Sequence, residues 1–422
     1  MQKSVLTILL FLLGCSLFSQ ESEIESDTLR KDALKVFMEA SDYYRSTEAG
    51  DHIRREIPYI NYVRDIRDAD LYIISTRQRT GSGGWEYSYF LVGQHDFEGM
   101  VDTLQFTTTP DETEEGRRSK EASTLKMGLM RYVARTPLSQ YIDIRFTEPM
   151  SEIVSTDKWN NWVFSPSVSG FLMGEKTYTY QNVSVSFTAD RITEAWKFRT
   201  RLYYSHRVQK YDVGDEIISS QYNNKFVRTQ IVRSLTDHWS VGGQVNVGSS
   251  SFSNEDFYLE LLPGIEYDLF PYSESTRRQL RILYSVGYNY QNYTDTTIYN
   301  KIAEHLWMHS LSAAYQVIQK WGSINVNVSY SNYLHDWSKN NLDFGGEISL
   351  RIAKGLSLDL YGSYSIIHDQ LGLVKGDVSA EDILLQIREM ETQFSYYLSA
   401  GFSYTFGSIY NNVVNPRFGS YF

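Results

Sequence analysis

The feature that most constrains this chain is a strict alternation of apolar and polar side chains that recurs in long segments from Trp162 onward. Apolar residues fill every second position over Val183–Ala189, and the pattern returns over Ile324–Tyr330 and Tyr396–Phe406. A period of two places the apolar side chains on one face of a β-strand. The segments run for roughly ten to fifteen residues, which exceeds most strands of soluble sheets and suits a tilted strand that crosses a bilayer.

The pattern predicts about twelve antiparallel strands, an even number as bacterial barrels require. They are expected at 160–173, 177–189, 194–209, 220–233, 238–249, 255–270, 278–292, 304–318, 322–334, 341–353, 356–367 and 393–407. We therefore predict an all-β transmembrane barrel over residues 158–422.

The connections give a second criterion. Short turns are expected at 190–193, 235–237, 271–276, 319–321 and 353–355, and most alternate connections are expected to be longer, above all 293–303 and 368–392. The short first hairpin at 174–176 is the exception. Short turns inside and long loops outside are typical of outer-membrane barrels, so both ends of the barrel should lie in the periplasm.

Aromatic residues make up 15% of the chain, with 33 tyrosines. A soluble secreted protein has no need for so many, whereas a barrel places them in girdles at both lipid interfaces. The formal net charge is -11. We expect no nucleic-acid partner, because no basic stripe is available to neutralise phosphates.

Residues 1–20 are typical of a secretory signal peptide, with Lys3 before an apolar run from Val5 to about Phe18. The run is too short for a spanning helix. The stretch 12–15 also fits a lipobox with an acylated Cys15. Because Cys15 is the only cysteine, ordinary cleavage would leave a mature protein without disulfides or cysteine metal sites.

Residues 21–157 carry more charge and helical periodicity. Expected elements are an apolar run at 34–38, a helix at 53–67 despite Pro58, strands at 71–77, 87–93 and 102–108, and an amphipathic helix near 114–135. Packing on its own sheet explains that last helix, and a partner-binding face is the alternative. Glycine-rich 81–84 lacks the Lys-Ser/Thr of a phosphate loop and predicts a hairpin. The whole predicts a small α/β domain in the periplasm.

Five stretches carry a resemblance to known proteins: Ile53–Pro58, Asn61–Asp65, Asp68–Asp70, Thr80–Gly84 and Tyr404–Phe418. With them, nearly the whole mature chain resembles an uncharacterised family of Gram-negative outer-membrane β-barrel proteins with an N-terminal periplasmic α/β domain. The resemblance implies the fold and a place in the outer membrane, but no activity, ligand or cofactor.

Two weaker similarities concern the ends of the mature chain. The order of elements in the N-terminal region is similar to that of periplasmic domains of TolB-like and CsgG-like envelope proteins, an analogy of fold that names no site. The aromatic end of the last strand is similar to the signal that the barrel-assembly machinery recognises. That machinery, outer-membrane lipids and a periplasmic protein are therefore the expected partners.

The alternation also projects a set of charged side chains into the barrel interior. They are Arg199, Arg201, Arg228, Glu260, Glu266, Asp268, Arg281, Glu347, Arg351 and Asp359. They would form a charged constriction that selects small solutes. Alternatively, they would form a salt-bridged interior that fills a narrow barrel.

The leading hypothesis is a narrow passive channel without enzymatic activity. The alternatives are a membrane anchor that presents residues 21–157 to envelope partners and an outer-membrane hydrolase, which needs a nucleophile and a base together. His305 and His309 share a strand face, but roughly 13 Å separates them, too far for a dyad or a shared metal. They are better interpreted as interface histidines. We predict no catalytic residue, cofactor or metal site.

The longest expected outer loop, 368–392, contains a predicted helical stretch, Ser379–Glu391, with Ser379 as its N-cap. It would cap the pore, fold into it or form a surface epitope. The sequence does not choose among these.

Overall fold

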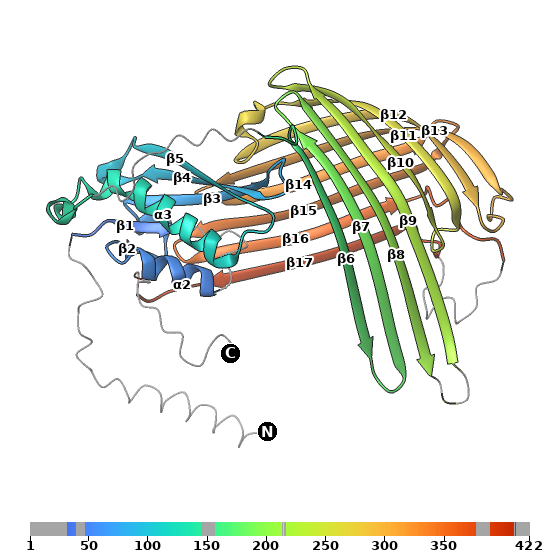
Figure 1. The fold of residues 1–422 in the computed structure, drawn as a ribbon, viewed down its shortest axis with the longest axis horizontal. Coiled ribbons are helices and arrows are strands. Elements are labelled where there is room, and N and C mark those ends of the chain that lie inside the picture. Colours follow the sequence, from blue (N-terminus) through green and yellow to red (C-terminus); the bar gives the residue numbers. More distant parts are fainter. Residues whose placement is uncertain are drawn as a thin grey trace.

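The computed structural model describes residues 32–38, 47–144, 157–212, 214, 217–376, 389–408 and 410. The predicted signal peptide, the lipobox at Cys15 and most of the helical stretch Ser379–Glu391 lie outside these residues. The described chain forms a large curved antiparallel sheet with a smaller α/β domain at one end of its strands (Figure 1).

The large sheet has 12 strands in sequence order, each antiparallel to the next. They are β6 (Trp162–Gly174), β7 (Tyr178–Ile192), β8 (Trp196–Asp212), β9 (Ile217–Ser234), β10 (Trp239–Ser250), β11 (Glu255–Asp268), β12 (Arg278–Tyr293), β13 (Ala303–Gln319), β14 (Gly322–Tyr333), β15 (Asp336–Ala353), β16 (Leu356–Ile367) and β17 (Phe394–Tyr404). The predicted fold class, a barrel-like sheet of this size preceded by a small α/β region, is confirmed.

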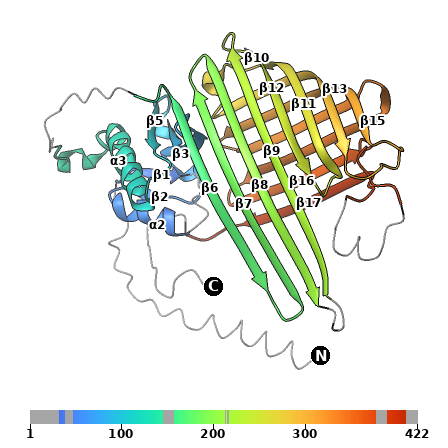
Figure 2. The same cartoon turned by 45° about the vertical axis from the view of Figure 1, so that its right-hand side comes forward.

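The two edges of the sheet are β6 and β17. In the part of the chain that the structure describes, these strands are not hydrogen-bonded to each other. They run in clearly different directions in both views (Figures 1 and 2). The curved sheet is therefore open along one side.

The strand bounds lie close to the predicted ones except where the long loops were expected. β9 begins at Ile217 rather than 220, and β15 begins at Asp336 rather than 341. The expectation that most connections at the end of the sheet that carries 294–302 and 368–393 are longer is therefore wrong. The connection 294–302 is no longer than 269–277 at the opposite end, so the asymmetry rests on 368–393 alone. Beyond the bilayer both strand faces meet water, so the alternation fades while the backbone ladder continues. We call this the long-loop end and the opposite one the short-turn end.

The cross-strand register separates two faces. On β7 the exposed apolar residues Val183, Val185 and Phe187 share the outward face. The inward face carries Ser184 and Ser186, whose hydroxyls pair with serines of β6 at 2.7 Å. The large sheet is thus apolar outside and polar inside, as the alternation predicts.

Aromatic rings gather at both ends of the outward apolar face. Near the short-turn end the ring centroids of Trp239 and Tyr267 lie 4.7 Å apart, and near the long-loop end those of Tyr288 and Trp307 lie 5.5 Å apart. Trp196 and Tyr204 on β8 are separated by about 26 Å along the strand. This spacing fits the apolar band of a transmembrane barrel. Among the described residues, no helix is both long and apolar enough to cross a membrane.

The α/β domain is built on a five-stranded sheet with the order β2-β1-β3-β4-β5. Its elements are β1 (Lys35–Met38), α2 (Thr47–Glu56), β2 (Asn61–Tyr62), η2 (Ile66–Asp68), β3 (Leu71–Arg79), β4 (Trp85–Gly93), η3 (His95–Phe97), β5 (Val101–Thr108), α3 (Glu114–Val133) and η4 (Pro137–Tyr141). β1 is parallel to β2 and β3, and β3, β4 and β5 are antiparallel. The predicted hairpin is confirmed: Gly83, with φ 81°, lies in the turn between β3 and β4.

The predicted helix at 53–67 is wrong beyond Glu56. α2 ends there, two residues before Pro58, because proline lacks an amide donor and disfavours helical geometry in the residue before it. The chain then forms β2 and the 3-10 helix η2. A strand as short as β2 has no periodicity that a sequence pattern could reveal.

Helix α3 packs on its own sheet, as predicted. Leu125, Leu129 and Tyr132 join a buried cluster with Tyr89 and Leu91 of β4. A buried network adds to this packing. Arg117 Nη1 donates to Glu121 Oε2 at 3.0 Å, and the Tyr89 hydroxyl donates to Glu121 Oε1 at 2.5 Å. Burial raises the pKa of Glu121 to about 8, while the neighbouring guanidinium favours the ionised carboxylate.

We expect Glu121→Ala to lower the free energy of local opening of α3 by about 3 kcal/mol, because Arg117 and Tyr89 lose a buried acceptor. Hydrogen exchange of α3 amides in the full-length protein in detergent measures this change. Met127 is 71% exposed on the same helix, so Met127→Ala is the matched control, with a change below about 0.5 kcal/mol. Equal protection in both variants would contradict the prediction.

Candidate functional site

The first group of inward charges lies in one row across β8 to β11. Arg201 is paired in register with Arg228, Arg228 with Asn246, and Asn246 with Glu260. Arg228 Nε donates to Asn246 Oδ1 at 2.9 Å, and the Asn246 amide donates to Glu260. The guanidinium of Arg201 lies over the ring of Tyr203, 5.2 Å from its centroid. Asn246 thus connects a predicted basic residue to a predicted acidic one.

Two more arginines lie beside carboxylates towards the short-turn end. Arg199 Nε lies 3.3 Å from Asp190 Oδ1, and Arg281 Nη1 lies 3.9 Å from Glu266 Oε2. Glu266 also accepts a hydrogen bond of 2.8 Å from the hydroxyl of Tyr272. Asp190 is not among the charges predicted for the interior, although its position opposite Arg199 follows from the strand register.

The remaining predicted charges have separate environments. Asp268 is fully buried and caps a turn, since its Oδ1 accepts from the backbone N–H groups of Phe270 and Leu280 at 3.1 and 3.0 Å. Asp359 accepts from Ser349 at 2.6 Å.

Arg351 and Glu347 line a cavity of about 540 Å³ beside residues of β3. Arg351 also places its guanidinium 5.3 Å from the ring centroid of Phe37 in β1. Several of the predicted interior charges thus form ion pairs, and Asp268 caps a turn. That these charges form a selective constriction stays a prediction.

The α/β domain lies against the short-turn end of the large sheet (Figure 1). Ile74 and Phe90 point away from the helices, yet they are only 3% and 9% exposed. Arg277, in the connection that also contains η5 (Tyr272–Glu274), places its guanidinium 5.1 Å from the ring centroid of Phe90. At the hairpin tip, a Cβ built on Gly81 would lie 3.0 Å from the Cβ of Ile192. The sheet of the domain is therefore covered by helices on one face and by the barrel on the other.

A polar contact fixes the other side of the domain. Asp65 accepts the backbone N–H of Gly355 at 2.8 Å through Oδ2, and that of Arg67 at 3.0 Å through Oδ1. Asp68 forms an ion pair of 2.7 Å with Lys354. Asp65 and Asp68 belong to two of the stretches that carry the family resemblance, but nothing in the sequence indicated their common partner, the turn between β15 and β16.

The resembling stretch after β17 meets the same region. Val63 and Tyr410 form an isolated β-bridge. A cavity of about 660 Å³ lies between the domain, the β15–β16 turn and the end of β17. Its lining includes Arg54, Arg64 and Lys354.

The long-loop end is covered by part of the last loop. Leu371 is 5% exposed and packs on inward-facing Leu306, Met308 and Tyr333. The backbone of residues 373–375 bonds to residues 296–298 of the loop between β12 and β13. Of the alternatives for this loop, the contacts of its described residues fit a cap over the long-loop end.

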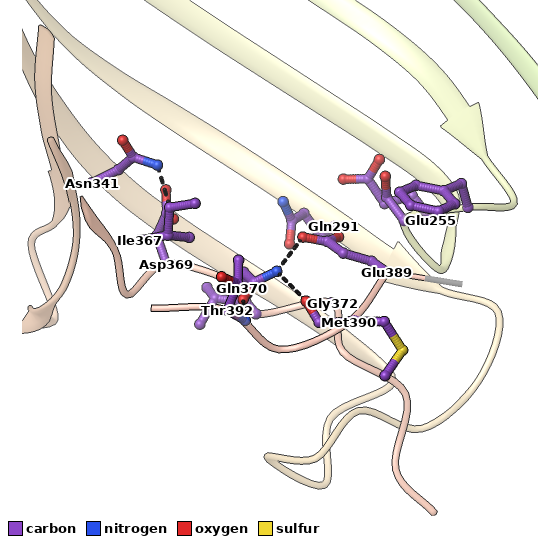
Figure 3. Close-up of a pocket in the computed structure, with 13 residues that line it drawn as sticks. Glu255, Gln291, Asn341, Ile367, Asp369, Gln370, Gly372, Glu389, Met390 and Thr392 are labelled. Carbon is purple, nitrogen blue, oxygen red and sulfur yellow. Dashed lines mark hydrogen bonds between the residues drawn. The ribbon is translucent and has the colours of Figure 1, made fainter. Parts of the chain in front are cut away.

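A cavity of about 630 Å³ remains beneath this cap (Figure 3). Gln370 organises it: its amide donates to Glu389 Oε1 and the Met390 carbonyl at 2.7 and 2.9 Å, and its Oε1 accepts from the Thr392 N–H at 2.8 Å. Asp369 accepts from the Asn341 amide at 3.3 Å, and burial raises the pKa of Asp369. No sequence pattern distinguishes Gln370 or Leu371 from the other residues of this loop.

The two histidines of the hydrolase hypothesis lie among outward aromatic residues. His305 Nδ1 is 2.6 Å from the hydroxyl of Tyr288, and the ring of His309 meets that of Trp337 edge-on, 5.5 Å between centroids. Each has its own partners, as interface histidines would. Among the described residues, no group of three or more His, Cys, Asp or Glu side chains is placed to hold a metal.

Comparisons with known proteins give no family. No family model and no curated protein sequence matches the chain. Among solved structures, the translocator domain of autotransporter NalP from Neisseria meningitidis is similar, with a TM-score of 0.23 and 11% identity over 68% of this chain and 98% of that one. This likeness carries no inference. The class is instead defined by the barrel-like sheet with its apolar band and aromatic girdles, an architecture that supports an outer-membrane β-barrel.

We expect the double variant Asp65→Ala, Asp68→Ala to loosen the α/β domain from the barrel. It removes the acceptor for Gly355 and the partner of Lys354, a loss of about 2 kcal/mol that raises the undocked fraction roughly thirtyfold. The readout is hydrogen exchange of residues 354–357 in the full-length protein. Asp96→Ala, an exposed carboxylate of the same domain, should leave it unchanged. Similar exchange in the two variants would show that these contacts do not hold the domain.

We expect the cap at the long-loop end to loosen as the pH rises. The raised pKa of Asp369 means that the packed cap favours the protonated carboxyl, so this stabilisation is complete below the ordinary aspartate pKa and is lost as the pH passes the raised value. Opening free energies of residues 370–375, from hydrogen exchange corrected for intrinsic rates, should fall over that range. Asp369→Asn should flatten the profile; an unchanged slope would assign it to another group.

Proposed function

We propose that this protein is a non-enzymatic outer-membrane β-barrel that holds its α/β domain at a fixed position on the periplasmic mouth, with both ends of the interior covered in this state. The observation that carries the proposal is the burial of Phe90 under Arg277 of the β11–β12 connection, together with the contact of Asp65 with Gly355. A domain attached only by a flexible linker would leave that face of its sheet exposed.

A second candidate function, a passive channel for small solutes, has support from the charged interior. Arg201, Arg228 and Glu260 lie in one row across neighbouring strands. A row of charged side chains in a narrow pore would select solutes by their charge. In this state the channel would be closed by Leu371 at one end and by the α/β domain at the other. Conduction would then require that both covers move.

Several surfaces bear on the expected partners. The outward apolar band between the aromatic girdles would contact outer-membrane lipids. On the domain, β5 is an edge strand, and Met127 of α3 is exposed. These are the places where a periplasmic protein would meet the fixed domain.

Planar-bilayer recordings of the full-length protein test the covered interior. We expect the wild-type protein, the Leu371→Asp variant and the double variant Asp65→Ala, Asp68→Ala to be nearly silent, because each leaves at least one cover in place. The combination should conduct. In that background Arg201→Ser should alter ion selectivity, and outward-facing Thr200→Ser should not. Sustained conductance by the wild-type protein would overturn the anchor proposal in favour of an open channel.

A further inference from the structure

Among the residues that the structure describes, the open side of the large sheet presents two unpaired strand edges at membrane depth. Leu172 of β6 and Leu398 of β17 are both 75% exposed on the outward face. Along each edge, half of the backbone N–H and C=O groups point away from the neighbouring strand. In hydrocarbon, each unsatisfied group costs several kcal/mol, so these edges need a partner.

The two edges fit each other. β6 and β17 are antiparallel, since they are the first and last strands of an even-numbered sheet that runs up and down. The inward face of β6 carries Ser165, Ser167 and Ser169, and that of β17 carries Ser399 and Ser403. The outward faces of both strands are apolar. If inward residues of β6 pair with inward residues of β17, the serines of both strands face the barrel interior and the apolar side chains of both strands face the lipid.

One residue makes this seam weaker than the other ladders. Pro166 lies within β6, and the β6–β7 ladder runs through it without interruption. Its missing N–H therefore faces the open edge and not β7. Pro263 in β11 differs, because there the β11–β12 ladder skips residues 262 and 263. Its missing N–H faces β12, and pairs between β11 and β12 on both sides of the skipped residues hold these two strands together.

We propose that β6 and β17 form a lateral gate: they pair with each other in a closed state and separate in the open state seen here, which connects the interior to the membrane. The proposal goes beyond the fixed domain of the proposed function. The domain contacts both flanks of the seam, at Ile192 near β6 and at the end of β17. Closure of the seam would therefore shift one of these two contacts.

Cysteine pairs in outer membranes test whether the edges meet. Ser167→Cys combined in turn with Ser399→Cys, Gly401→Cys or Ser403→Cys joins inward positions, and at least one pair should form an intramolecular disulfide. Ser167→Cys with Leu398→Cys, Ala400→Cys or Phe402→Cys mismatches the faces and is the matched control. No disulfide in any inward pair overturns the proposal. Disulfide-linked dimers would show instead that the edges pair between two copies.

Distances between spin labels at Ser167 and Gly401 in lipid nanodiscs test the gate itself. Two populations are expected, and Pro166→Ala should raise the closed-to-open ratio about fivefold by restoring one hydrogen bond. Pro263→Ala, whose new donor faces β12, should leave the ratio unchanged. One narrow population in every variant would mean a static seam and would overturn the gate. The fixed domain is tested separately, by hydrogen exchange of residues 354–357 and by the bilayer recordings, so failure here leaves the proposed function standing.

Discussion

The structure depends on the backbone hydrogen bonds of one long antiparallel ladder. A chain that crosses a bilayer on strands must satisfy each N–H and C=O through a neighbouring strand, since hydrocarbon offers no partner. From β6 to β17 every strand has such a neighbour. Because neighbouring strands are also consecutive in the sequence, short connections are enough to bring them together. The same constraint makes the two outer edges the most costly part of the fold. It also explains why a single residue without a donor, Pro166, matters at an edge.

The ladder has a second consequence, because it turns a polar face inward. Inward charges have little water in a narrow barrel and therefore need partners. Arg199 beside Asp190, and Arg228 joined to Glu260 through Asn246, meet that need within neighbouring strands. Near the two ends, inward-facing residues instead contact segments from outside the sheet: Leu371 packs on Leu306 at one end, and Phe37 of β1 lies beside Arg351 at the other.

These segments make the barrel and the α/β domain one assembly. The domain's sheet has two faces to bury. Its helices cover one, and the short-turn end of the barrel covers the other through Phe90 and Ile74. At the long-loop end, Leu371 does the equivalent by filling an apolar patch of Leu306 and Tyr333. Contacts of this kind cover the interior at both ends.

The sequence by itself determined the strands, their number, their two faces and the α/β character of the N-terminal part, because side-chain alternation and helical periodicity are local patterns that burial imposes on each element. Its local signals failed where the pattern was weak or short: α2 ended before Pro58, β2 had two residues, and β15 continued past the bilayer. The partners of Asp65, Asp268 and Gln370 could not be read from the chain. Only the tertiary structure decided them, since a single carboxylate or amide has the same sequence signature whether it caps a turn, docks a domain or faces a pore, and the choice depends on which distant backbone groups the fold brings within hydrogen-bonding distance.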